Sequence, residues 1–291
     1  MRRPARLLVL LSLGLATQLQ AGPALPSVGM PQAGQIPRAD AACALRANRA
    51  DGWERRPENT VANNATSSRS VRWSMETETV RWRRWTAKRS WVTGRYTGTT
   101  NQIFIWAGCK WGVDSDLLRA VAVQESDWRQ DTVGDDGGSF GIMQIKDHYA
   151  DGAPAWGGYP ATLSATALNV DFYAAYLRSC LDGDFYDGGR WLYRGQSMAE
   201  VIADHGAEYA LWGCIGSWYS GHWYDEGARP YIGQVKERLR ARSWLRPDAN
   251  DDAADSAPAG RRGDENRRSA PMLSRSPLGR RRARAADRTP A

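Results

Sequence analysis

The sequence predicts a mainly α-helical fold. Between residues 96 and 246, apolar residues recur at spacings of three and four, and few segments alternate with the period of two that strands show. This stretch of roughly 150 residues is long enough to bury one hydrophobic core. Hydrophobic residues make up 42% of the chain and charged residues 24%, which excludes a wholly disordered protein.

Start and stop signals place the helices of this stretch. Asp114 is a suitable N-cap, and Gly112 is suited to end the helix before it. The expected helices, in chain order, are Gln102–Trp111, a second capped by Asp114, a third capped by Ser164 that includes Leu168–Leu181, and two runs at about 198–220 and 230–244.

The N-terminus predicts a signal peptide that ends between residues 21 and 24. A basic start precedes ten almost wholly apolar residues, Leu7 to Ala16, and small residues follow. This run is too short to cross a bilayer, and no later run reaches the roughly 20 residues needed. We therefore expect an exported protein, secreted or in the periplasm or cell envelope, with no transmembrane segment.

The net charge of +7 comes from the segments on either side of residues 96–246. Residues 247–291 contain ten Arg against seven acidic residues and no Phe, Trp or Tyr, which predicts a disordered basic tail. Residues 96–246 are acidic, with 13 basic against 19 acidic residues. The Arg280–Arg282 cluster suits an anionic envelope polymer, and a solvated tail without a partner is the simpler alternative.

Residues 22–95 are predicted to be a linker followed by a basic, Trp-containing extension. In residues 69–95, eight Lys or Arg interleave with Trp73, Trp82, Trp85 and Trp91. Such a mixture can bind single-stranded nucleic acid. In an exported protein we favour an extension that wraps the main domain with its Trp rings inward, and we expect no nucleic-acid partner.

Four cysteines in an exported chain predict two disulfides, and four allow three pairings. We expect Cys180 to pair with Cys214 inside the main domain, and Cys43 with Cys109 to tether the N-terminal segment. The cysteines lack C-x-x-C spacing, the three histidines lie far apart, and the acidic loops fit no EF-hand, so no metal site is expected.

One predicted helical face carries a carboxylate among apolar residues. Leu118, Val121, Ala122 and Glu125 follow the spacing i, i+3, i+4 and i+7, and Trp128 lies on nearly the same face. Apolar neighbours favour the protonated form of a carboxyl group, as a general acid requires. A glutamate backed by tryptophan can protonate a glycosidic oxygen. The alternative is a helix-end glutamate that points to water.

Motifs around this glutamate resemble those of the soluble lytic transglycosylase (SLT) family, whose catalytic domain is goose-lysozyme-like. The resemblance covers about residues 98–244. Its motifs, in family order, are Gly112–Asp114 with Leu117–Ala122 and Gln124–Ser126, then Gly141–Ile145, Asn169–Val170 with Tyr173 and Tyr176–Leu177, Trp218–Gly221, and Tyr231–Val235.

The resemblance implies a single lysozyme-like domain, residues 96–246, that acts on peptidoglycan. It would cleave the β-1,4 bond between N-acetylmuramic acid (MurNAc) and N-acetylglucosamine (GlcNAc) and form 1,6-anhydro-MurNAc. Glu125 would be the catalytic residue, first as acid and then as base. We expect a monomer with peptidoglycan glycan strands as its partner and no cofactor.

The resemblance also implies substrate-binding residues, which in this sequence are Ser126, Ser139, Met143, Gln144, Asn169, Trp218 and Tyr219. Gln144 is expected to hydrogen-bond the sugar, and Asn169 to cap a helix or organise the cleft.

The sequence departs from the family pattern near the glutamate. Gly134 stands where a serine often supports the glutamate, so Ser139 is expected to replace that serine. The aromatic residue that usually faces the glutamate aligns with Trp218, and Tyr219 is shifted by one, which leaves both as candidates.

Two other functions stay open. A lysozyme-type muramidase, which is a hydrolase, would use water and usually a second carboxylate, for which Asp135, Asp136 and Asp147 are candidates. A non-catalytic glycan-binding module would hold sugar without cutting it, and the presence of Glu125 with Ser126 on the apolar face argues against that reading.

Overall fold

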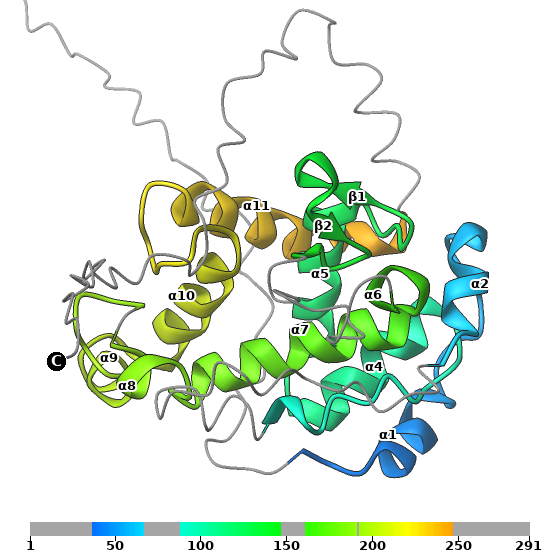
Figure 1. The fold of residues 1–291 in the computed structure, drawn as a ribbon, viewed down its shortest axis with the longest axis horizontal. Helices are drawn as coiled ribbons and strands as arrows, with labels where there is room; N and C mark the ends of the chain where they lie inside the picture. Colours follow the sequence, from blue (N-terminus) through cyan, green and yellow to red (C-terminus); the bar gives the residue numbers. More distant parts are fainter. Residues whose placement is uncertain (1–36, 67–87, 147–160, 191, 247–291) are drawn as a thin grey trace, which may run out of the picture.

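The computed structural model describes residues 37–66, 88–146, 161–190 and 192–246, and within them the fold is mainly helical, as predicted (Figure 1). The helices are α1 (Asp40–Ala47), α2 (Thr60–Asn63), α4 (Thr100–Trp111), α5 (Ser115–Ser126), α6 (Ala161–Ser164), α7 (Thr166–Leu181), α8 (Tyr186–Gly189), α9 (Met198–His205), α10 (Ala207–Ser220) and α11 (Ala228–Ala241), with short 3₁₀ turns at Pro57–Asn59, Asp135–Gly137 and Ser243–Leu245. The predicted signal peptide, the tail from residue 247, and Trp73, Trp82 and Trp85 lie outside the described residues.

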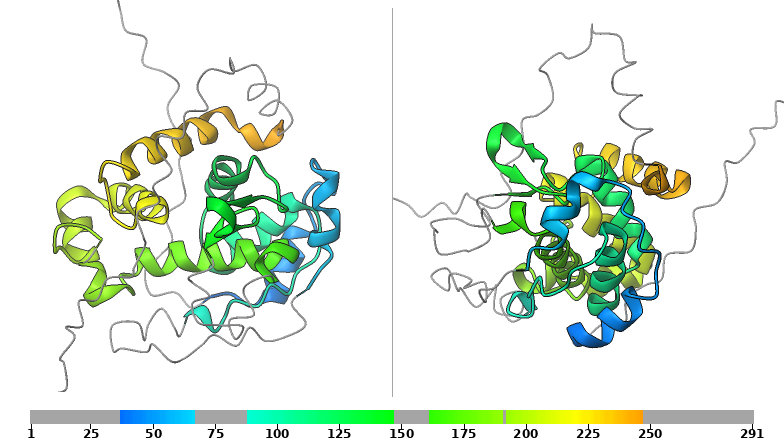
Figure 2. Two further views of the ribbon diagram at one scale, coloured as in Figure 1. Left: turned by 45° about the horizontal axis from the view of Figure 1, so that its top comes forward. Right: turned by 90° about the vertical axis from the view of Figure 1, so that its right-hand side faces the viewer.

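Helix α7 is the central element, because every one of its 16 residues is buried. Helices α4 and α10 pack against it. Figures 1 and 2 show α2 near the end where α7 begins, and α8 and α9 near the end where it stops. Asn169 and Asp171, two polar residues of this buried helix, have their side chains hydrogen-bonded inside the protein.

Helices α4 and α5 begin and end at the predicted signals. Thr99 and Gln102 form a capping box at the start of α4, and Gly112 ends it with a left-handed φ of 67°. The Asp114 side chain accepts hydrogen bonds from the backbone N–H groups of Asp116 and Leu117 at the start of α5. Helix α5 then packs against α4 and α11.

The third helix begins differently from the prediction. Ser164 is the last residue of α6, and Ala165 is the N-cap residue of α7 without a side-chain hydrogen bond. Its start is fixed instead by tertiary contacts, since Asn169 in the first turn is fully buried and bonded. The run expected at 198–220 is two helices, which Gly206 separates at φ 88°.

A small sheet follows α5. Strands β1 (Val133–Gly134), β2 (Ser139–Phe140) and β3 (Ile145–Lys146) pair antiparallel in that order, with Val133 opposite Phe140 and Ser139 opposite Lys146. Each strand has two residues, which is too short to show a period-two pattern, so the sequence did not predict these strands. The sheet carries the Gly141–Ile145 motif between β2 and β3.

Both disulfides have the predicted pairing. Cys180–Cys214 joins α7 to α10, and Cys43–Cys109 joins α1 to α4. The residues around α1 therefore differ from the linker expected there: they form a helix that packs on α4. Trp91 is 50% exposed, so this ring does not point inward as expected.

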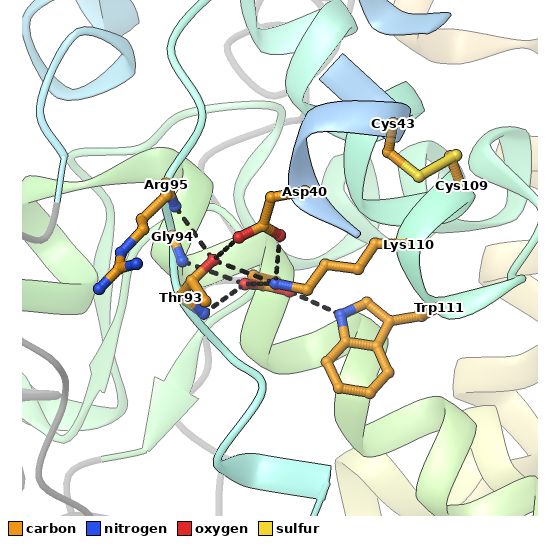
Figure 3. A network of polar contacts seen from close by, with 9 residues as sticks. Asp40, Cys43, Thr93, Gly94, Arg95, Cys109, Lys110 and Trp111 are labelled. Atoms are coloured by element: carbon orange, nitrogen blue, oxygen red, sulfur yellow. Dashed lines mark hydrogen bonds and ion pairs between the residues drawn. A yellow bond between two sulfur atoms is a disulfide. The ribbon is translucent and has the colours of Figure 1, made fainter. Parts of the chain in front are cut away.

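A buried polar network reinforces the attachment of α1 (Figure 3). Lys110 Nζ lies 2.8 Å from a carboxylate oxygen of Asp40 and 2.8 Å from one of Asp171. The Thr93 hydroxyl donates to Asp40 at 2.8 Å. The N-terminal segment is thus tied to the helical core by a covalent bond and by an ion pair from the partly exposed Asp40 to the buried Lys110.

Candidate active site

Glu125 lies in the last turn of α5, where the helix leaves the core. Leu118, Val121 and Ala122 of the same face are fully buried, as the spacing predicted, while Glu125 is partly exposed. Trp128 is buried against Phe104 of α4, with ring centroids 4.8 Å apart. The helix therefore presents a carboxylate at the edge of an apolar core.

Tyr231 of α11 donates a hydrogen bond from its hydroxyl to Oε1 of Glu125. The Tyr231 side chain is buried, and burial, followed by the negative charge of Glu125, raises the pKa of this phenol well above 10. Gln124 donates to the Gln234 side chain at 3.1 Å and holds α5 beside α11 next to this pair. Tyr231 therefore keeps its proton and stays a donor near neutral pH.

Two consecutive aromatic residues at the end of α10 pack on the phenols around Glu125. Tyr219 stacks on Tyr231, with ring centroids 5.2 Å apart and an interplanar angle of 11°, and is 46% exposed. Trp218 is buried and meets Tyr173 and Tyr176 of α7 edge-on, at 4.8 Å from each. Tyr231 therefore contacts Glu125 directly, and Tyr219 reaches this pair through the Tyr231 ring.

Asn169 organises the loop that contains Met143. Its Oδ1 accepts from the Met143 N–H at 2.8 Å, and its Nδ2 donates to the Phe140 and Thr162 carbonyls at 2.9 Å each. Gly141 has a φ of 76°, and a Cβ there would lie 2.3 Å from Nδ2 of Asn169. Of the two roles expected for Asn169, these contacts match the organiser.

The same loop is tied to α5. The Ser126 hydroxyl lies 3.0 Å from the Ile142 carbonyl, to which it can donate. The Gln144 Nε2 donates both of its protons within the loop, to the Thr132 carbonyl at 3.1 Å and the Gly141 carbonyl at 2.8 Å. Within the described residues no donor to the Gln144 side-chain oxygen is seen, so this oxygen can accept a hydrogen bond from a ligand.

The Ser139 hydroxyl donates to Asp135 Oδ2 at 2.6 Å, whereas the sequence assigned Ser139 to the support of Glu125. Lys146 Nζ lies 2.9 Å from the same oxygen. These contacts close the turn between β1 and β2, in which Asp136 is exposed. Asp147, the third candidate for a second carboxylate, lies outside the described residues.

Sequence reasoning gave Tyr231 no role, although it lies in the closing motif. The only local signal was a residue with a polar tip on the buried face of α11, beside Ile232 and Val235. In the part of the chain that the structure describes, no group of three or more His, Cys, Asp or Glu could hold a metal ion. Nor does any described helix have the length and apolar composition that a membrane span requires.

A partly exposed carboxylate that is oriented by a phenol from a second helix defines a candidate for general acid–base chemistry. Residues 102–191 match the family model of the transglycosylase SLT domain, so the chain carries an SLT domain within its helical fold. The matched segment includes Glu125 and the Gly141–Ile145 loop, while Tyr219 and Tyr231 lie beyond its end. Searches of curated proteins and of solved structures found no match to the chain.

An SLT domain suggests a lytic transglycosylase and implies binding to peptidoglycan. Peptidoglycan lies outside the cytoplasm, and disulfides persist in oxidising compartments. The SLT domain and the two disulfides together suggest an extracytoplasmic location.

Proposed function

We propose that the protein is an exported lytic transglycosylase that cleaves the MurNAc-β-1,4-GlcNAc bond of peptidoglycan and forms 1,6-anhydro-MurNAc. Glu125 is the catalytic residue in this proposal. The observation that supports it most directly is the hydrogen bond from Tyr231 to Glu125, a carboxylate inside the matched SLT domain.

In the first step the protonated Glu125 carboxyl gives its proton to the O4 atom of the leaving GlcNAc. The bond between C1 of MurNAc and this O4 breaks, and its electron pair goes to O4. The acetamido oxygen of the same MurNAc then stabilises the positive charge at C1. No second protein carboxylate is required, which fits the engagement of Asp135 with Ser139 and Lys146.

In the second step the ionised Glu125 takes the proton of the C6 hydroxyl of the same MurNAc. The O6 atom forms a bond to C1, the acetamido oxygen leaves, and the 1,6-anhydro ring closes without water. Glu125 is again protonated. Tyr231 supports this cycle because a donor that keeps its proton stabilises the ionised carboxylate between the two steps.

Of the predicted substrate-binding residues, Tyr219 is exposed and the other six are buried. The Tyr219 ring is accessible and offers a flat face for a sugar, and the Gln144 carbonyl oxygen offers an acceptor. Ser126, Ser139, Met143, Asn169 and Trp218 are buried, so we assign them to holding the loop and the phenols in place. The site would thus contact glycan with few residues on a rigid support.

The finer location follows from the ends of the sequence. We propose that a signal peptide ending between residues 21 and 24 directs export, and that the basic tail, residues 247–291, holds the enzyme near an anionic envelope polymer. The enzyme acts as a monomer in this proposal.

The decisive experiment is digestion of purified peptidoglycan and mass spectrometry of the products, for the wild type and Glu125→Gln. We expect anhydro-MurNAc ends from the wild type and a loss of about 10²–10⁴-fold in Glu125→Gln, because an amide cannot donate or accept the catalytic proton. Glu208→Gln on α10 is the matched control. Reducing ends would instead identify the muramidase, and the absence of cleavage would favour the glycan-binding module.

A further inference from the structure

Tyr173 of α7 carries a buried hydroxyl that the steps above do not use. Its side chain is 0% exposed, and among the described residues no group forms a hydrogen bond with its hydroxyl. Burying a hydroxyl without a partner opposes folding, and phenylalanine would fill nearly the same volume without that penalty. This hydroxyl belongs to the aromatic cluster that surrounds Glu125, because Tyr173 packs on Trp218, the neighbour of the Tyr219 that stacks on Tyr231, so a partner engaged during the reaction would satisfy it.

The surroundings of Tyr173 fix its ring firmly. Trp218 meets it edge-on at 4.8 Å with an interplanar angle of 87°, and Tyr176 lies 6.4 Å away, centroid to centroid. Tyr176 already has a partner, since its hydroxyl lies 3.2 Å from Ser217 Oγ. Tyr173 is therefore a rigid phenol one helical turn from a phenol whose hydrogen bonding is satisfied.

Tyr173 and Tyr231 lie within electrostatic reach of the same carboxylate, from α7 and α11. Burial raises the pKa of Tyr173 well above 10, and the charges of Glu125 and then Tyr176 raise it further. The pKa of Tyr231 is raised by burial, then by Glu125 and Tyr173. The titratable groups that act electrostatically on these two hydroxyls are thus Glu125 on α5, Tyr173 and Tyr176 on α7, and Tyr231 on α11.

We propose that Tyr173 is a second positioning phenol for Glu125: its hydroxyl donates a hydrogen bond to the carboxylate once the first proton transfer has ionised it, while Tyr231 remains the first donor. The proposal rests on the proposed function, in which Glu125 is ionised between the two steps. The motion required is a rotation of the Glu125 side chain, which is partly exposed and so is not enclosed by packing.

The test compares Tyr173→Phe with Tyr176→Phe in the full chain. We expect Tyr173→Phe to lower kcat about tenfold, because a donor to the charged intermediate is lost. Its melting temperature should stay equal or rise, since an unsatisfied hydroxyl has been removed. Tyr176→Phe should lower the melting temperature, because the buried hydrogen bond between the Tyr176 and Ser217 hydroxyls is lost.

A carbon-13 NMR titration of the Glu125 carboxyl group separates positioning from structure. In Tyr173→Phe the titration should move to higher pH, because the ionised form has lost a donor, whereas in Tyr176→Phe it should match the wild type. If Tyr173→Phe leaves the titration and kcat unchanged, the hydroxyl does not act on Glu125 and only lowers the stability of the fold. A parallel loss of activity and melting temperature without a titration shift would also overturn the proposal.

The titration needs no substrate, so it reports on Tyr173 whatever the reaction is. If the wild type releases reducing ends, the proposed function is disproved, but the titration still shows whether Tyr173 acts on Glu125. A wild type that releases anhydro ends, combined with an unmoved titration, would disprove the role of Tyr173 alone.

Discussion

Asp171 on α7 and Glu125 on α5 are two carboxylates of the same helical body that are held in contrasting ways. Asp171 is fully buried and accepts hydrogen bonds from the Lys110 ammonium at 2.8 Å, the Trp111 Nε1 at 2.6 Å, and the backbone N–H groups of Thr93 and Gly94 at 2.8 and 3.0 Å. Glu125 is partly exposed and receives the hydroxyl of a neutral phenol.

The comparison distinguishes a carboxylate that stabilises the fold from one that can take part in acid–base chemistry. The Asp171 carboxylate is fully buried, and its oxygens are occupied by an ammonium and three N–H donors, so it is not accessible to a substrate. A phenol that keeps its own proton is a neutral donor, so it orients a carboxyl group and favours the ionised form over the protonated form less than an ammonium does. The first arrangement suits the attachment of residues 93–94 and α4 to α7, and the second suits acid–base chemistry.

Replacing each carboxylate by alanine gives the largest expected difference between the two sites. Asp171→Ala leaves Lys110 and three N–H donors without their shared acceptor, which we expect to lower the free energy of unfolding by about 3–5 kcal/mol. Glu125→Ala leaves the Tyr231 hydroxyl without its acceptor, beside a partly exposed position, so we expect a smaller loss of about 1–2 kcal/mol. Urea denaturation monitored by circular dichroism measures both, and equal losses of stability would remove the distinction.

A second substitution tests the support of the Glu125 site rather than its chemistry. Gly141→Ala places a Cβ at a left-handed φ and 2.3 Å from Asn169 Nδ2, so we expect a loss of about 2–4 kcal/mol in stability and of activity. Gly137→Ala is the matched control, because Gly137 has a φ of 96° but a Cβ added there would meet no atom within 4 Å. Calorimetry of both variants isolates the cost of the clash, and equal losses would argue against it.

A smaller effect is expected from Tyr231→Phe, which removes one donor from Glu125. We expect kcat to fall about tenfold to a hundredfold, since a hydrogen bond to a charged group is worth about 1.5–3 kcal/mol. Loss of a donor to the ionised form raises the pKa of Glu125, so the alkaline limb of kcat/KM, where the general acid loses its proton, should move to higher pH. A pH–rate series on both enzymes checks the direction.

Tyr209→Phe is the control for this substitution. It removes a phenol that donates to Tyr193 at 3.0 Å, away from Glu125. Its pH profile should keep the wild-type midpoint. A shift of similar size in both variants would mean that Glu125 responds to general loosening of the fold rather than to its own donor.

The sequence predicted the helices whose ends are set locally. Asp114 and Gly112 act within one turn of chain, and the apolar spacing before Glu125 defines its face without help from elsewhere. Ser164 failed as a cap because α7 starts where its buried side chains find partners, and such partners are distant in sequence. Tyr231 lies 106 residues from Glu125, so no local pattern could pair them.

The ordered structure of the N-terminal segment around α1 was not predicted, for the same reason. Its composition resembles a linker, and its order comes from partners on α4: Cys109 for Cys43, and Lys110 for Asp40. A linker-like composition therefore does not exclude order where a disulfide and an ion pair to a buried lysine offset the entropy cost of fixing the chain.

The adjacent positions of Cys109 and Lys110 have a practical consequence for defining the catalytic unit. Both residues lie inside the segment that matches the SLT domain, and both have partners on α1, which lies far outside it. A fragment cut at the start of the match would expose a free thiol and leave a buried ammonium with one of its two carboxylates. We infer that the smallest part of the chain that folds on its own begins ahead of residue 40 and includes α11, whose Tyr231 bonds Glu125. It is therefore considerably longer than residues 102–191, which match the SLT domain.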